Sequence, residues 1–218
     1  MTSQMKTIDK TIISYLYFFP ILILTLLVLP SCGKNYSPEQ KAYIEKIEKE
    51  RRSKNEFMKN DPASPFNYKM KIKFHDLNYY DVNPDFVFKS KLYEYSHKDT
   101  IIIYGTKGEP RKMVKFGYVK INFKNKPINV NVYEGKTNSG LTYYSIWFTD
   151  LTTNKETYGV GRYLDFEKVD DPNYIYTIDF NLAYNPYCAY NPNYSCAIPT
   201  KDDFIPIEIK AGEKKFHE

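Results

Sequence analysis

Hydrophobic residues follow three successive patterns along this chain of 218 residues. A nearly unbroken apolar run covers residues 12–29. A mixed segment with apolar residues at helical spacing follows over residues 38–59. From Tyr68 onward, apolar and polar residues alternate with a period of two, which is typical of β-strands that bury one face. These patterns predict a targeting segment, one helix and a β-rich domain.

The apolar run has the features of a secretory signal. Lys6 and Lys10 precede it, and Leu29-Pro30-Ser31 leads directly into Cys32. A basic flank, a short apolar stretch and a small residue at the junction favour a cleaved signal peptide. The junction resembles a bacterial lipobox, in which the cysteine is acylated on sulfur, for example by palmitate. The alternative is an uncleaved signal anchor with an incidental cysteine, since about 20 apolar residues span a bilayer.

A lipobox divides the chain into a signal peptide over residues 1–31, a tether over residues 32–36 and a single domain over residues 37–218. It also predicts a location in the bacterial cell envelope, with the membrane as a partner through the lipid anchor. Each buried CH₂ of an acyl chain contributes about 0.8 kcal/mol, so a multiply acylated cysteine anchors the protein without a spanning helix.

Composition narrows the range of partners. The net charge is only +5, which is compatible with anionic headgroups or acidic glycans and too weak to indicate nucleic acid. The chain has 22 tyrosines, but it is also rich in lysine, asparagine and isoleucine. This combination is expected from an AT-rich genome, so the tyrosine content alone does not indicate a sugar-stacking surface.

Helix-start signals mark the beginning of the folded domain. Ser37 can cap a helix, Pro38 suits its first turn, and Gln40 completes a capping box. We predict a helix from Pro38 to about Lys59. It could bind a partner or a membrane surface, or it could pack over the domain, and we favour packing.

The remaining pattern predicts about nine short strands with close, turn-like connections. Such connections favour antiparallel pairing, because parallel strands need long crossovers. We therefore expect a mainly β domain, an antiparallel barrel or sandwich with one N-terminal helix. The expected strands are Lys69–Phe74, Phe86–Tyr95, Thr100–Tyr104, Lys112–Phe123, Ile128–Tyr133, Thr142–Thr149, Gly159–Phe166, Tyr174–Leu182 and Phe204–Ile209.

Two further cysteines, Cys188 and Cys196, remain once Cys32 is lipidated. In an oxidising compartment an even pair predicts a disulfide, which here closes a short loop. A metal site is the alternative, but no histidine has a zinc-type spacing to either cysteine. We predict a disulfide and neither a metal nor a cofactor.

Several motifs carry a family resemblance. The segment from Thr157 to Asp165 reads TYGVGRYLD, and the segment from Asp179 to Cys188 reads DFNLAYNPYC. With Cys196 and the closing AGEK of residues 211–214, these resemble the domain-of-unknown-function 1684 family. The resemblance implies a single mostly β domain, often found in bacterial envelope lipoproteins, with a cysteine pair and no agreed activity. It supplies no catalytic residue to carry over.

Arg162 has an unusual predicted position. Alternation places it with Leu164 and Phe166 on the apolar face of its strand, with Asp165 on the other. A charge facing a core must be paired, and counting along the preceding strand makes Asp150 a diagonal partner. Arg162 could instead clamp a carboxylate or phosphate at a barrel mouth. We favour the ion pair.

Polar residues on the next strand complete the candidate ligand site. Asp179 and Asn181 alternate with an apolar face, and Tyr184 precedes a turn. Together with Arg162 and Asp165, they could form a small binding site or a hydrogen-bonded structural corner, and we favour the corner.

No motif for nucleophilic, phosphate-binding or metal catalysis is present. We expect a non-enzymatic binding or scaffolding module for a small anionic or glycan ligand, or for an envelope protein. The alternative is a hydrolase in which Asp165 and Asp179 act as acid and base while Arg162 orients an acidic substrate.

The lipid anchor can be tested directly. Cys32→Ser should move the protein from the membrane fraction to the soluble fraction, because no acyl chain can then be attached. Immunoblotting of separated fractions measures this, with Cys188→Ser as the matched control that stays bound. Unchanged fractionation of Cys32→Ser would contradict the anchor.

Overall fold

Nine strands, one long helix and four short 3-10 helices make up the secondary structure of the described residues. The computed structural model describes residues 34–137 and 139–217, so the predicted signal peptide and Cys32 lie outside the described residues. The fold presented here is that of the unit Pro38–Glu218. Within the described part, no helix is long and apolar enough to cross a membrane.

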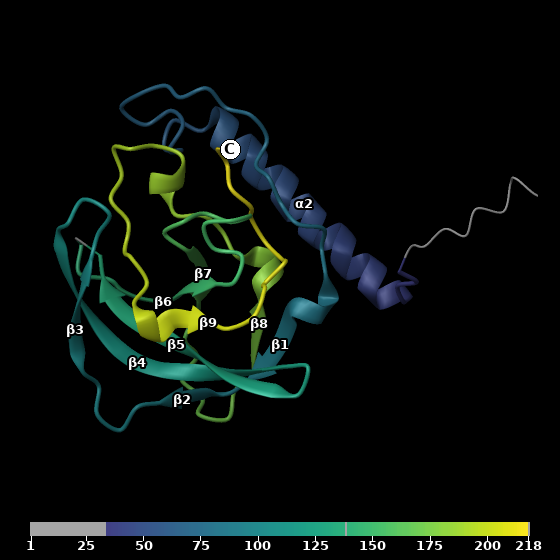
Figure 1. The fold of residues 1–218 in the computed structure, drawn as a ribbon, viewed down its shortest axis with the longest axis vertical. Helices are drawn as coiled ribbons and strands as arrows, with labels where there is room; N and C mark the ends of the chain where they lie inside the picture. Colours follow the sequence, from purple (N-terminus) through teal and green to yellow (C-terminus); the bar gives the residue numbers. More distant parts are fainter. Residues whose placement is uncertain (1–33, 138, 218) are drawn as a thin grey trace, which may run out of the picture. The chain divides into compact units, whose positions relative to one another are not determined.

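The elements follow one another in the order shown in Figure 1. They are α2 (Pro38–Asn60), η1 (Pro84–Phe86), β1 (Val87–Ser90), β2 (Leu92–Glu94), β3 (Thr100–Tyr104), β4 (Pro110–Phe123), β5 (Lys126–Lys136), β6 (Thr142–Asp150), β7 (Arg162–Phe166), β8 (Tyr176–Asp179), η2 (Phe180–Leu182), η3 (Tyr187–Ala189), η4 (Lys201–Asp203) and β9 (Phe204–Ile205).

Two sheets form the β structure. The larger has the order β2-β4-β5-β6-β7, with β3 also paired to β4 and β9 to β6. The smaller consists of β1 and β8. All pairings between these strands are antiparallel except that of β6 with β9. The mainly antiparallel prediction is therefore confirmed, while the described strands do not close into a barrel.

Agreement is close for the helix and for β3. Two expected strands differ in kind, and others are shorter than expected: Phe204–Ile209, for example, is confined to the two residues of β9. The segment Lys69–Phe74 is not a strand. Its alternation arises because Ile72 and Phe74 pack against a small apolar cluster without any strand neighbour. The expected strand Phe86–Tyr95 is divided into β1 and β2, which pair with β8 and β4 respectively.

Side-chain hydrogen bonds explain two of the strand ends. The Ser90 hydroxyl accepts from the backbone N–H of Lys120 at 2.8 Å and donates to the Lys91 carbonyl at 2.7 Å, at the point where the chain passes from one sheet to the other. The Asp179 carboxylate accepts from the Asn181 N–H at 2.9 Å and so caps η2. Strand β8 therefore ends at Asp179 instead of continuing to Leu182.

Helix α2 packs along the β structure (Figure 1). Its residues Ile47 and Met58 are buried. The Tyr43 hydroxyl donates to Asp179 at 2.7 Å, and the Arg51 guanidinium donates to the Tyr80 carbonyl at 2.8 Å. These contacts confirm the interpretation of α2 as a helix packed over the domain.

The main core is built from both sheets. It contains apolar side chains of the strands together with residues of the C-terminal segment, among them Phe88, Val119, Val132, Ile146, Phe148, Leu164, Ile178, Phe180 and Ile209. Side chains on the opposite face of the larger sheet form a separate cluster of Ile103, Met113, Tyr133, Trp147 and Ala197. The sheet thus has one fully packed face and one face that the chain covers only in part.

Arg162 lies inside the main core with its guanidinium 1% exposed. Nη2 forms an ion pair with Asp150 Oδ2 at 2.9 Å and also donates to the Ile209 carbonyl at 2.9 Å. Nη1 donates to the carbonyls of Ala211 at 2.5 Å and Glu213 at 3.2 Å. The predicted diagonal ion pair is confirmed.

The carboxylate of Asp150 is equally well satisfied. Its Oδ1 accepts from the Thr152 N–H at 2.9 Å and from the Thr152 hydroxyl at 2.6 Å, while Oδ2 accepts from the Ile209 N–H at 3.1 Å. Burial lowers the pKa of Arg162, and the neighbouring Asp150 charge partly opposes that shift. A buried ion pair is stable only when its remaining donors and acceptors are satisfied, and this pair meets that condition.

We predict that Arg162→Ala lowers the free energy of unfolding by about 3–5 kcal/mol, because it leaves the buried Asp150 charge without a partner. Urea denaturation of the detergent-solubilised full chain measures the change. Arg52→Ala, at a helix arginine whose side chain is 68% exposed, should change it by less than about 0.5 kcal/mol. Equal effects of the two substitutions would contradict the role given to the ion pair.

Candidate functional site

The structure places the five residues of the predicted ligand site in three environments. Arg162 lies in the core, on the opposite face of β7 from Asp165, as the alternation predicted. Asp179 and Asn181 are buried beneath α2. Tyr184 is half-buried and contacts Asp165. Asp165 and Tyr184 therefore form a direct pair on an accessible surface, and Asn181 lines a cavity of about 300 Å³ beside them.

Asp179 and Asn181 form a hydrogen-bonded corner. The Asn181 side-chain amide donates to the Asn83 carbonyl at 2.9 Å and to the Tyr43 hydroxyl at 3.0 Å, while its oxygen accepts from the Asn83 N–H at 2.8 Å. The Tyr43 hydroxyl donates to Asp179, and burial together with this carboxylate raises the pKa of Tyr43. These polar groups are occupied by internal partners, so the corner holds α2 against the domain.

Asp165 and Tyr184 are brought together by a backbone bridge. The N–H of Tyr163 donates to the Tyr184 carbonyl at 2.8 Å, and the N–H of Tyr184 donates back to the Tyr163 carbonyl at 2.9 Å. This pairing sets the Tyr184 hydroxyl 2.7 Å from Asp165 Oδ1, to which it donates. Burial, and secondarily the charge of Asp165, raises the pKa of Tyr184. Tyr184 therefore remains protonated at neutral pH and orients the Asp165 carboxylate.

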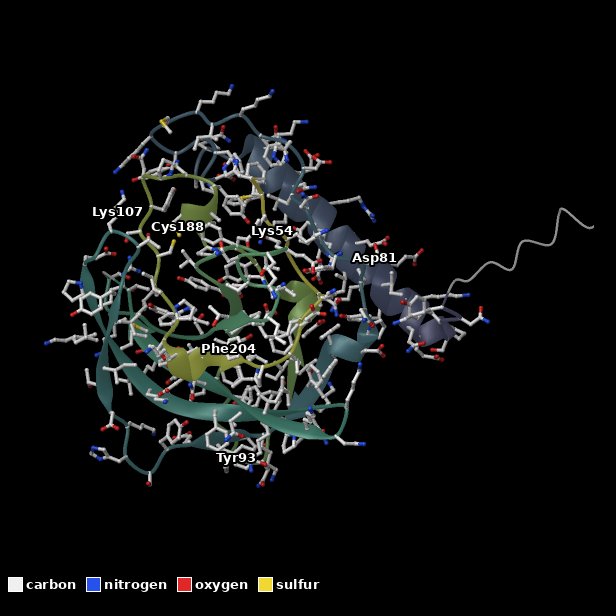
Figure 2. All side chains as sticks on the ribbon, viewed as in Figure 1. Lys54, Asp81, Tyr93, Lys107, Cys188 and Phe204 are labelled. Atoms are coloured by element: carbon white, nitrogen blue, oxygen red, sulfur yellow. The ribbon has the colours of Figure 1, made fainter. Side chains whose placement is uncertain are left out.

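Two of the open cavities bordered by this pair meet there, and Lys54, which Figure 2 labels, lines the smaller of the two. Their volumes are about 650 Å³ and 480 Å³. They share five wall residues, and we call the two cavities together the tyrosine groove. The shared residues are Tyr163, Asp165, Tyr184, Ser195 and Cys196.

Aromatic rings dominate the walls of the tyrosine groove. The larger cavity includes Trp147, whose ring stacks on Tyr133 with centroids 5.2 Å apart. Tyr163 packs against Trp147 at 5.7 Å and against Tyr184 at 6.0 Å. The smaller cavity adds Phe57, Tyr187 and Tyr194. The groove therefore offers flat apolar surfaces next to a few polar groups, which is typical of a binding site for a small molecule.

The cationic side chains of the groove are already neutralised. Arg111 pairs with Glu109 at 2.7 Å, Lys54 pairs with Glu213 at 2.7 Å, and Lys168 pairs with Asp170. The carboxylates of Asp165 and Glu167 are exposed wall groups, and neither has an ion-pair partner among residues 34–137 and 139–217. The free charge of the groove is therefore negative.

The predicted disulfide is not present in the structure. Cys188 and Cys196 are both free thiols, and the backbone N–H of Cys188 donates to Cys196 Sγ at 3.2 Å. The cysteines are thus adjacent, as predicted, but unbonded. In the part of the chain that the structure describes, no group of three or more histidine, cysteine or acidic side chains could hold a metal ion.

The residues of the hydrolase hypothesis do not share a site. Arg162 is enclosed by the core on the face of β7 opposite to Asp165. Asp179 is buried, with its carboxylate occupied by Tyr43 and Asn181. Neither residue lines the cavities beside Asp165. The acid, base and orienting residue that this mechanism needs are therefore not assembled around one substrate position.

Several wall residues were not anticipated from the sequence. Tyr163 shares its alternation face with Asp165 and could have been identified by that signal. Arg111 from β4, Lys54 from α2 and Trp147 from β6 come from elements that are distant in sequence. Their proximity depends on strand order and helix placement, for which the chain carries no local signal.

Comparison with known proteins identifies the family and the fold. The solution NMR structure of an uncharacterized protein from Haloarcula marismortui superposes with a TM-score of 0.60 at 21% identity, covering 83% of this chain and 98% of that chain. At this identity the likeness shows the fold alone. No curated protein matches the chain. The model of the protein family of unknown function DUF1684 matches residues 72–214, which is more than half of the chain. The chain belongs to the DUF1684 family.

Proposed function

We propose that this protein is a lipid-anchored binding module of the bacterial envelope, and that the tyrosine groove takes a neutral, hydroxyl-rich ligand such as a saccharide. The observation that carries the proposal is the combination of an open aromatic groove with two wall carboxylates, Asp165 and Glu167, that lack ion-pair partners in the described chain.

The aromatic walls favour a ligand with flat apolar faces. A pyranose ring presents C–H groups on its face and hydroxyls around its rim. Dispersion contacts of those C–H groups with the partly exposed rings of Tyr163 and Tyr184 would each be small, but they add up. The two rings around Tyr163 have centroids 5.7 and 6.0 Å from it, so a ligand would meet preformed aromatic surfaces.

The charges of the walls decide between a saccharide and an anion. An anionic ligand would have to compete for Arg111 and Lys54 with Glu109 and Glu213, which already hold them. It would also approach the free carboxylate of Asp165. An ionised carboxylate accepts hydrogen bonds from several hydroxyls at once. The groove therefore suits the glycan ligand better than the small anionic ligand.

The anchor gives the proposed module its location. Acylation at Cys32, followed by the tether of residues 32–36, would hold the domain close to a lipid leaflet. A groove of modest affinity would be sufficient for binding at that location. The membrane confines the protein to the surface where envelope glycans are concentrated, which raises their effective concentration. Scaffolding of an envelope protein would need a flat partner surface, and the concave tyrosine groove argues for a smaller ligand.

Trp147 provides a direct test, because it is the single tryptophan of the chain and lies in the wall of the larger cavity. Chitotetraose, a neutral tetrasaccharide, should change the fluorescence of the detergent-solubilised full chain in a saturable manner. Tetragalacturonate, of similar length but acidic, should bind at least about tenfold more weakly, because it meets the free Asp165 charge. Tighter binding of the acidic sugar, or no saturable response to chitotetraose, would refute the proposal.

The role of Asp165 in this binding can be tested with a matched pair of substitutions. Asp165→Asn should weaken chitotetraose binding about tenfold, which corresponds to about 1.4 kcal/mol, because a charged acceptor is replaced by a neutral amide. Asp76→Asn removes an exposed carboxylate outside the groove and should leave binding unchanged. Equal affinities of the two variants would place the ligand elsewhere.

A further inference from the structure

The segment that carries Cys196 joins two parts of the sheet. The Cys196 carbonyl accepts from the Thr106 N–H at 2.9 Å, next to a bridge between Gly105 and Ala197 at the end of β3. On the other side, the Tyr163 hydroxyl of β7 donates to the Ala197 carbonyl at 2.5 Å. Cys196 thus lies where the chain closes over the partly covered face of the larger sheet, and it lines both cavities of the tyrosine groove.

The loop between the two cysteines is already folded while both are thiols. The Asn191 side chain is buried and donates to the Pro65 carbonyl at 2.7 Å, and its oxygen accepts from the Asn193 N–H at 2.9 Å. Lys107, labelled near Cys188 in Figure 2, donates from Nζ to the Asn193 carbonyl at 3.0 Å. In the folded protein, bond formation between the sulfurs would therefore remove little further conformational entropy from this loop.

Hydrogen bonds stabilise the reduced form. Cys196 Sγ accepts from the Cys188 N–H at 3.2 Å, and Cys188 Sγ accepts from the Tyr158 hydroxyl at 3.8 Å. Such donors stabilise a charged thiolate more than a neutral disulfide sulfur, so they make the oxidised form easier to reduce.

We propose that Cys188 and Cys196 form a reversible dithiol–disulfide pair, with Cys188 as the attacking thiol and Cys196 as the resolving thiol, which exchanges with external dithiols and disulfides. Cys188 is half-buried and the more exposed of the two, whereas Cys196, although it borders the groove, is only 8% exposed. This inference does not depend on the identity of the ligand in the tyrosine groove.

The thiols have different acidities, as the assignment requires. Hydrogen bonding to Cys196, and more weakly to Tyr158 and Thr106, lowers the pKa of Cys188 to about 7. Its hydrogen bond to Cys188, followed by burial, raises the pKa of Cys196. Since the thiolate is the nucleophile, Cys188 is the group that reacts near neutral pH.

The exchange balances in two steps. The Cys188 thiolate attacks one sulfur of an external disulfide, forms a mixed disulfide and expels the other sulfur as a thiolate. The Cys196 thiol then gives its proton to that external thiolate and attacks the sulfur of Cys188, which breaks the mixed disulfide and releases the second external thiolate. The Cys188–Cys196 pair loses two electrons, and the external disulfide gains them.

Equilibration with glutathione buffers tests the proposal. The full chain is incubated in mixtures of reduced and oxidised glutathione, quenched with acid and alkylated. Peptide mass spectrometry then reads the 188–196 pair separately from Cys32. We expect the oxidised fraction of the Cys188–Cys196 pair to pass one half at a ratio of reduced to oxidised glutathione that can be prepared. A pair oxidised in every mixture would be a structural disulfide, and a pair reduced even in oxidised glutathione alone would be inert, so either result would overturn the proposal.

Single substitutions separate the roles of the two cysteines. Cys196→Ser should trap a glutathione mixed disulfide on Cys188, whereas Cys188→Ser should trap little on the buried Cys196. Equal trapping in both variants, or preferential trapping on Cys196, would overturn the assignment.

Tyr158→Phe tests the stabilisation of the thiolate without touching sulfur. It should slow iodoacetamide alkylation of Cys188 at pH 7 about threefold, because the hydroxyl that donates to the sulfur is lost. Tyr104→Phe, at a tyrosine that is 57% exposed, is the control and should leave the rate unchanged. Equal rates in the two variants would remove Tyr158 from the mechanism and contradict the proposed stabilisation of the reduced form.

Discussion

The burial of one guanidinium constrains much of this fold. Arg162 must be satisfied on every side, and the chain supplies Asp150 from β6 and three carbonyls from residues 209–213. The C-terminal segment is thereby fixed against the sheet, which places the buried Glu213. Its carboxylate pairs with Lys54 of α2 at 2.7 Å and accepts from the Asn185 N–H at 2.8 Å. Helix and loop positions around the tyrosine groove thus depend on a charge in the core.

Local patterns in the sequence were sufficient for this ion pair, since both residues face the core by simple alternation along neighbouring strands. They were sufficient for α2 and β3 for the same reason: capping residues and a period of two are properties of short segments. The segment Lys69–Phe74 shows where such inference fails. Its alternation is real, but Ile72 and Phe74 pack on other loops, and a strand requires a neighbour that no local pattern specifies.

The candidate site was predictable only in part, because its residues were selected by their proximity in sequence. Asp165 and Tyr184 do meet, and they do so through a backbone bridge between β7 and the turn before η3. Asp179 and Asn181 occupy the same sequence neighbourhood, but their hydrogen bonds are used to cap η2 and hold Tyr43. Polar residues on the less apolar face of a strand are ambiguous until the element covering that face is known. Here it is α2, which begins more than a hundred residues earlier.

Tyrosine content illustrates how a compositional bias can still have structural consequences. Tyrosine is abundant along the whole chain, and the hydroxyls of three tyrosines determine where their rings are held. Tyr163 donates to the Ala197 carbonyl, Tyr184 to Asp165 and Tyr158 to the Cys188 carbonyl at 3.4 Å. Phenylalanine would fill the same volume and lose these bonds, so β7 would lose its side-chain contacts with Ala197 and Tyr184, and Tyr158 would lose its contact with Cys188. The aromatic walls of the groove and the position of the thiols are therefore consequences of the same hydroxyl contacts.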